Sequence, residues 1–109
     1  MEIPDVVMKY NTDYMVVLLL LMQDENKFGK AYDLNRIANF WFGLYNCFDK
    51  VKELCEMSYV IEIKLESLGY STYSIAPLGV QYYNTFLDEF KQEIPSKFAH
   101  KLNDIKLLF

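Results

Sequence analysis

The chain has 109 residues, of which 52% are hydrophobic and 17% aromatic, and its formal net charge is −4. This apolar content suffices for one packed domain and is too high for intrinsic disorder. The acidic balance opposes non-specific binding to nucleic acid or to an anionic membrane. A monomer of this size would expose some of its aromatic rings, so we also expect a subunit interface.

The longest apolar stretch is nine residues, from Tyr14 to Met22. A membrane-spanning helix needs about 20 apolar residues, and no basic leader precedes this stretch. Capping residue types at positions 11–13 predict that a helix begins there, runs to about Gln23 and is buried on most sides. We therefore expect a cytoplasmic protein without membrane contact. The polar segment 24–30 predicts a loop.

Two further helices are predicted on either side of a turn at Gly43. Asp33 is a capping residue type, and apolar residues then recur at helical spacing from Leu34 to Trp41. A third helix is predicted over about residues 45–57. Its inner face would carry Leu44, Phe48, Val51, Leu54 and Cys55.

A change of period after the third helix predicts a β-hairpin. Apolar Ile61, Ile63 and Leu65 alternate with charged residues, as in a strand whose charged face meets water. A turn is expected around Gly69. The second strand would then place Tyr73 and Ile75 together on one face.

The last part of the chain is predicted to be helical. Pro77 lacks an N–H and suits the first turn of a helix. Apolar residues follow at helical spacing, and Pro95 is expected to end this helix. A final helix would present a heptad-like stripe of Phe98, Leu102, Ile105 and Phe109.

Three stretches resemble the winged helix-turn-helix superfamily. "DLNRIANFWFGLYNCFDKVKELCEM" resembles its paired helices, "LCEMSYVIEI" the passage from recognition helix to wing, and "YSTYSIAPLGVQYY" the end of the wing. The last two are similar to patterns in microbial regulators of the MarR and PadR groups, in which a glycine usually stands where this chain has Ser58. The similarity covers about residues 13–92.

The resemblance implies a mainly α fold with a small β-hairpin, a winged helix with an added C-terminal helix. The single domain would comprise a helix-turn-helix at about 33–57, a wing at about 60–76, a packing helix at about 78–94 and a terminal interaction helix at about 96–109.

The function implied by the resemblance is that of a small transcriptional regulator binding double-stranded DNA. The third helix would read the major groove through Asn46 and Lys50. Tyr70 would touch a sugar–phosphate backbone. The expected phosphate contacts are Lys27, Lys30, Arg36, Lys52 and Lys64.

The alternative is a winged-helix protein-interaction module, such as an adaptor or an anti-repressor, that does not bind DNA. Residues 24–76 hold six basic and eight acidic side chains, a net charge of −2. The segment "NFWFGLY" is also rich in rings, which either pack in the core or line a groove for a partner. At least one of the four rings at positions 40, 41, 42 and 45 should point outward.

The terminal stripe at residues 98, 102, 105 and 109 is the predicted interface of a homodimer. The first helix, apolar nearly all round, would contribute to the same contact. The alternative is that the terminal helix folds back onto its own subunit.

Catalysis has little support in the sequence. Cys47 and Cys55 would lie about 12 Å apart along one helix, too far to form a disulfide, and are expected to be buried thiols. His100 has no metal co-ligand nearby in sequence. We therefore expect a protein that is not an enzyme and binds no metal or cofactor.

Overall fold

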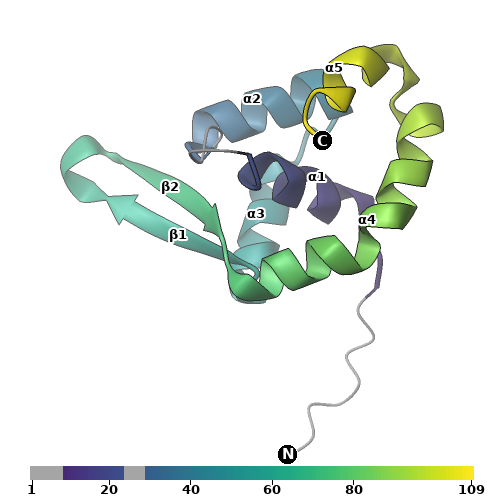
Figure 1. The fold of residues 1–109 in the computed structure, drawn as a ribbon. Helices are drawn as coiled ribbons and strands as arrows, with labels where there is room; N and C mark the ends of the chain where they lie inside the picture. The colour runs from purple at the N-terminus through teal and green to yellow at the C-terminus, as the bar shows by residue number, and fades with distance from the viewer. Residues whose placement is uncertain (1–8, 24–28) are drawn as a thin grey trace, which may run out of the picture.

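The computed structural model describes residues 9–23 and 29–109, which form a mainly helical domain with one antiparallel hairpin (Figure 1). This coarse fold class is the one predicted. The α-helices are α1 (Thr12–Leu21), α2 (Ala31–Phe42), α3 (Cys47–Glu56), α4 (Pro77–Lys97) and α5 (Leu102–Lys106). The strands are β1 (Val60–Leu65) and β2 (Tyr70–Ile75), and 3-10 turns lie at η2 (Glu66–Leu68) and η3 (Ala99–Lys101).

Helix α1 lies at the centre of the domain and contacts α2, α3 and α4. The Asn11 side chain accepts a hydrogen bond from the backbone N–H of Tyr14, which caps the helix as predicted. All seven residues from Met15 to Leu21 are buried. The expectation of a helix buried on most sides is confirmed, although the helix ends at Leu21, two residues before Gln23.

Helices α2 and α3 are joined by a turn at Gly43, which adopts a left-handed φ of 67° that favours glycine. The predicted cap at Asp33 was wrong. Helix α2 begins at Ala31, two residues earlier, with Lys30 as its N-cap residue and no side-chain hydrogen bond at the cap. Asp33 instead lies in the first turn, where a carboxylate interacts favourably with the helix dipole.

The buried face of α3 differs from the predicted one. Cys47, Val51 and Leu54 are buried, whereas Phe48 is 49% exposed. Val51 and Leu54 were predicted correctly. The buried face is shifted around the helix axis toward Cys47 and Leu54, by less than the step of about 100° between successive residues, because Val51 is buried in both arrangements. Phe48 therefore belongs to the outer surface.

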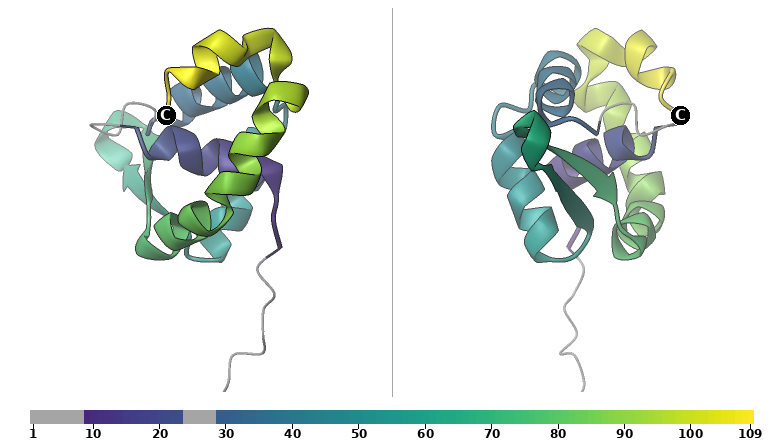
Figure 2. Two further views of the ribbon diagram at one scale, coloured as in Figure 1. Left: turned by 45° about the vertical axis from the view of Figure 1, so that its right-hand side comes forward. Right: turned by 90° about the vertical axis from the view of Figure 1, so that its left-hand side faces the viewer.

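The hairpin pairs Val60 with Ile75 and Glu62 with Tyr73, and it projects from the helices (Figures 1 and 2). A short segment before α2 joins it: the backbone N–H of Tyr73 donates to the Gly29 carbonyl at 2.7 Å, and Lys30 forms an isolated bridge with Thr72. The middle of β2 is thereby tied to the segment that leads into α2.

The hairpin turns the unexpected face toward the core. Directly paired residues share a face, so Val60, Glu62 and Tyr73 lie on one side of the sheet. Val60 and Tyr73 are buried, whereas Ile61 and Ile63 on the other side are 48% and 47% exposed. The prediction that only the charged face meets water was wrong, because the face with buried residues is the one that carries Val60, Glu62 and Tyr73.

Helix α4 begins at Pro77 as predicted but does not end at Pro95. It continues to Lys97, and Figure 1 shows it bent, with its last part rising toward α5. Proline within a helix removes the bond to the carbonyl four residues earlier, here that of Lys91, and kinks helices without always ending them.

The terminal segment folds onto its own subunit, in the second of the two predicted ways. It forms η3 and the short α5 in place of one continuous helix over 96–109. Phe98 is 5% and Ile105 0% exposed, and the rings of Phe98 and Phe42 meet edge to face at 5.0 Å between centroids. These two stripe residues are thus used within the chain. Leu102 is half-buried, and Phe109 is 48% exposed.

Candidate nucleic-acid interface

The outward face of α3 carries two of the predicted DNA contacts. Asn46, at the N-cap position, is exposed, and its side chain makes no capping hydrogen bond, so its amide is not used to cap the helix. Lys52 is also exposed. Phe48, Asp49 and Glu56 are exposed on the same helix. The Asn46 amide and the Lys52 ammonium group therefore share this surface with an aromatic ring and two carboxylates.

Lys50 does not lie on this outward face, contrary to expectation. Its side chain is 19% exposed, and its Nζ lies 3.7 Å from Glu53 Oε2 and 5.9 Å from the ring centroid of Tyr14. The Tyr14 hydroxyl donates to Glu53 Oε1 and completes a contact between α1 and α3. This bond to the carboxylate, together with burial, raises the pKa of Tyr14 to about 12. The rotation of α3 explains why Lys50 is turned toward α1.

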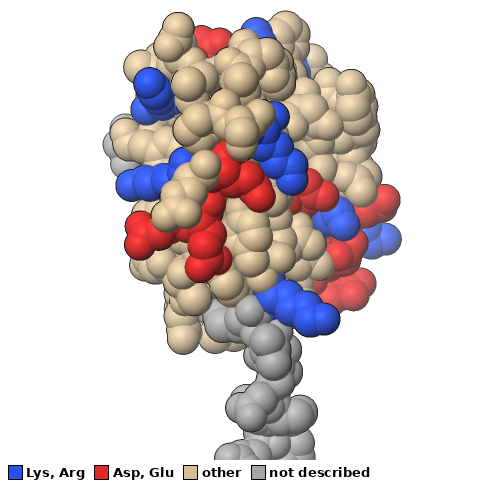
Figure 3. All heavy atoms as spheres, turned by 90° about the vertical axis from the view of Figure 1, so that its right-hand side faces the viewer, with Lys and Arg blue, Asp and Glu red and all other residues tan. Residues whose placement is uncertain are grey.

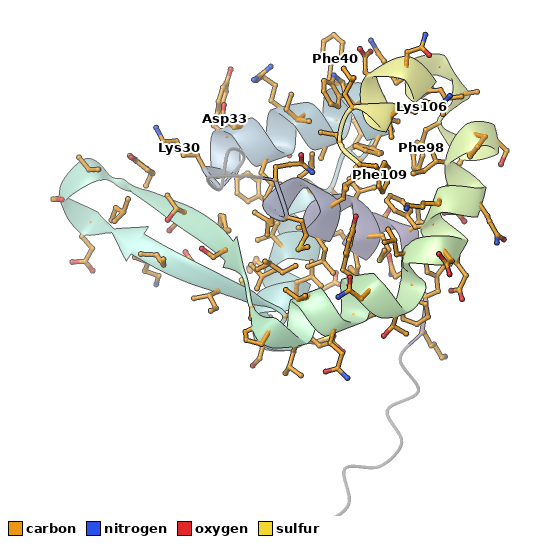
Figure 4. All side chains as sticks on the ribbon, viewed as in Figure 1. Lys30, Asp33, Phe40, Phe98, Lys106 and Phe109 are labelled. Carbon is orange, nitrogen blue, oxygen red and sulfur yellow. The ribbon has the colours of Figure 1, made fainter. Side chains whose placement is uncertain are left out.

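Three predicted contacts gather on and beside the hairpin. Lys30, just before α2, places its Nζ 5.4 Å from the centroid of the Tyr70 ring, a cation–π distance. Figure 4 shows Lys30 at the end of α2 nearest the hairpin. Lys64 is exposed and pairs with Ser71, on the other face of the hairpin from Tyr70. The hairpin thus offers cations on both sides.

Two predicted phosphate contacts remain, Arg36 and Lys27. Arg36 on α2 is exposed, with its Nη2 3.9 Å from Asp33 Oδ1, on the surface of α2 where Figure 4 labels Asp33. A solvent-exposed pair of this length is weak, so the guanidinium remains available to a phosphate. Lys27 lies outside the described residues.

A groove of about 200 Å³ separates α3 from the hairpin. Its charged lining consists of Lys52, Glu56 and Glu62. Burial, and then the nearby charges of Glu62 and Glu56, raise the pKa of the Cys55 thiol. The groove is therefore a region of net negative charge, and phosphate contact would depend on the cations at its edges.

Exposed aromatic residues are the feature that sequence reasoning only partly anticipated. Phe42 is buried, while Phe40 and Tyr45 are 62% and 85% exposed. Figure 4 shows Phe40 pointing outward near α5, where Lys101 Nζ lies 4.9 Å from its ring centroid. Exposure of Phe48 was missed because the residue had been assigned to the inner face. The equally regular spacing of Cys47, Val51 and Leu54 was the signal that could have revealed it.

No group of three or more His, Cys, Asp or Glu side chains able to hold a metal lies within residues 9–23 and 29–109. Burial raises the pKa of the Cys47 thiol to about 11, and His100 is exposed. Across the same residues no helix has the length and apolar character required to cross a bilayer.

Figure 3 shows the side of the molecule on which α4 lies. On this side Lys and Arg are interspersed with Asp and Glu and form no continuous patch. No protein-family model, curated protein or solved structure matches the chain.

Proposed function

We propose that the chain is a winged-helix transcriptional regulator that binds double-stranded DNA through α3 and the hairpin. The observation that carries the proposal is the order and pairing of the elements. A helix is followed by a bridge residue at Lys30, two helices joined by a tight turn, a projecting hairpin that pairs with the bridge residue, and a packing helix. In helix-turn-helix proteins the second helix of the pair enters the major groove.

The proposed contacts follow the exposed surface. Asn46 and Lys52 would face base edges from α3, since amide and ammonium groups are suited to purine edges in the major groove. Lys30, Arg36 and Lys64 would hold phosphates. Tyr70, beside Lys30, would rest on the sugar–phosphate backbone. Lys50 is omitted because Glu53 and Tyr14 already engage it.

A second candidate function is binding to a protein partner through the same face. Tyr45 and Phe48 are exposed on or beside α3, and aromatic residues of this kind often dominate the binding energy at interfaces. Asp49 and Glu56 flank them, so the matching partner would carry an apolar centre with basic residues around it.

The test is the fluorescence anisotropy of a labelled duplex of generic sequence, titrated with the protein at low and at physiological salt. The proposal predicts micromolar binding that falls steeply with salt, because phosphate neutralisation releases counterions. The double variant Lys52→Ala/Lys64→Ala should bind more weakly and lower the salt slope by about one, because Lys64 is the proposed phosphate contact of the two. Lys106→Ala, an exposed lysine on α5, is the matched control and should behave as the parent.

Absence of binding at low salt by the folded protein would sink the DNA proposal. The second candidate would then be tested by comparing the proteins retained by the parent chain and by Phe48→Ala. Under that candidate the variant loses its partner, whereas Lys52→Ala/Lys64→Ala keeps it.

A further inference from the structure

A hollow of about 460 Å³ lies between the end of α1, the middle of α4 and the last residues of the chain. Its size falls within the range of small-molecule pockets. The apolar lining includes Leu19 from α1, Leu87 from α4, and Leu108 and Phe109 from the terminal segment. Figure 4 shows Phe109 next to α1. Three segments distant in sequence thus build one concave surface, in which these apolar side chains stand beside the polar groups of Gln23, Tyr83 and Lys91.

The terminal wall of the hollow is held in place by a side chain of the opposite wall. Gln23 donates from Nε2 to the carbonyl oxygens of Leu19 and Leu108, at 2.9 and 3.2 Å. The bond to Leu108 joins residues 85 positions apart in the chain. A hydrogen bond therefore ties the terminal segment to the residue that follows the end of α1.

One of the residues that line the hollow, Tyr83, has a hydroxyl with no hydrogen-bond partner among the described residues. The Tyr83 side chain is largely buried and lines the hollow, and no described residue forms a hydrogen bond with its hydroxyl. In the part of the chain that the structure describes, every fully buried side-chain polar atom has a partner. The Tyr83 oxygen is therefore not fully buried, and the residue that carries it lines the hollow. Burial raises its pKa to about 12, so it stays a neutral donor at pH 7.

A cation stands at the same hollow. Lys91 is exposed, lines the hollow and places its Nζ 5.5 Å from the centroid of the Phe109 ring. No carboxylate of the described residues forms an ion pair with it. An O–H donor and an unpaired ammonium group beside an aliphatic wall complement an acid with an apolar tail.

We propose that this hollow binds a monocarboxylate with an unbranched apolar tail. The carboxylate accepts a hydrogen bond from the Tyr83 hydroxyl and pairs with Lys91, and the tail packs on Leu19, Leu87 and Leu108. The site lies on α1, α4 and the terminal segment, outside the surface proposed for DNA, so it stands or falls independently of that function.

The test is calorimetric titration of the full chain with decanoate and, as a neutral analogue of similar length, decanol. Decanoate should bind saturably with one molecule per chain, and decanol at least ten times more weakly. Tyr83→Phe keeps the ring and removes only the hydroxyl, and Lys91→Gln keeps much of the stem and removes the charge. Each should weaken decanoate about five- to twentyfold and leave decanol unchanged. Lys64→Gln, on the hairpin, is the control and should bind as the parent.

Equal affinity for decanol and decanoate, or full affinity in both variants with their circular dichroism intact, would overturn the proposed recognition of the acid. Absence of saturable binding up to millimolar decanoate would overturn the site itself. If, in addition, sedimentation shows a dimer that Leu107→Ala converts to a monomer, the hollow is an interface between two copies and the proposal fails.

Discussion

The carbonyl oxygen of Tyr59 lies so close to Gly79 that a Cβ at position 79 would overlap it. The same oxygen accepts the backbone N–H of Ala76 at 3.0 Å, and a Cβ on Gly79 would also come within 2.9 Å of Ile75 Cγ1. The first turn of α4 therefore rests on the backbone where β1 begins. This contact sets the angle between the hairpin and α4.

Replacement of this glycine should loosen the junction. Gly79→Ala should lower the free energy of unfolding by about 1–3 kcal/mol, because the overlap with backbone outweighs the gain of about 1 kcal/mol in helix propensity. Urea unfolding measures the difference. Asn84→Ala, exposed on the same helix, should stay within about 0.5 kcal/mol of the parent. Equal stability of the two variants would show that the close approach is not maintained in solution.

A second backbone position should respond in the opposite direction. Ser58 follows α3 and has a φ of 64°, in the left-handed region that is unfavourable for residues with a Cβ. Ser58→Gly should raise the stability by about 0.5–1 kcal/mol, since relief of strain exceeds the added entropy of the unfolded chain. Thermal unfolding would register this as a higher Tm. A lower Tm would contradict the left-handed conformation.

Which face of the hairpin packs against the core can be tested by placing a threonine on each face in turn. Ile63→Thr on the exposed face should change the stability by less than about 0.5 kcal/mol. Val60→Thr places a hydroxyl in a buried site and should cost about 1–3 kcal/mol. The variant with the lower urea midpoint identifies the face that is buried. A larger loss at Ile63 would mean that the outer face is covered in solution.

Features governed by neighbouring residues were predictable from the sequence. The Asn11 cap, the turn at Gly43 and the start of α4 at Pro77 all follow from local backbone chemistry. The alternation of apolar and polar residues also predicted the two strands of the hairpin. The period did not predict which face turns inward, because that choice depends on which side of the hairpin the helices cover.

Features governed by tertiary packing were missed for the same reason. Phe48 and Cys47 are adjacent and both apolar, so a helical period through either is plausible, and only contact with α1 and α2 selects Cys47. That selection moves Lys50 from the predicted reading face to the contact with α1. Pro95 was predicted to end its helix. Whether a proline ends a helix or only kinks it depends on the packing of the residues beyond it, which the local sequence does not give.

The contact between α1 and α3 should be measurable through one hydroxyl. Tyr14→Phe removes the donor to Glu53 and leaves a half-buried carboxylate with only Lys50, so it should cost about 1–3 kcal/mol. Tyr45→Phe removes a hydroxyl from a ring that is 85% exposed and should cost less than about 0.5 kcal/mol. Chemical denaturation of both variants gives the comparison. Equal costs would mean that the Tyr14 bond adds nothing.

Stability should decline at alkaline pH, and the direction follows from the raised pKa values of buried groups. Burial raises the pKa of Cys47 from 9.0 to about 11 and that of Tyr83 from 10.0 to about 12. The unfolded chain then loses these protons first, so their contribution is complete below about pH 9 and is lost as the pH rises through 11 and 12. Urea midpoints should be level from pH 7 to 8.5 and fall by pH 10.5. Tyr83→Phe should fall less steeply than the parent above pH 10, because one of the linked protons is absent. A midpoint that stays level to pH 11 would mean that these groups ionise freely in the folded chain.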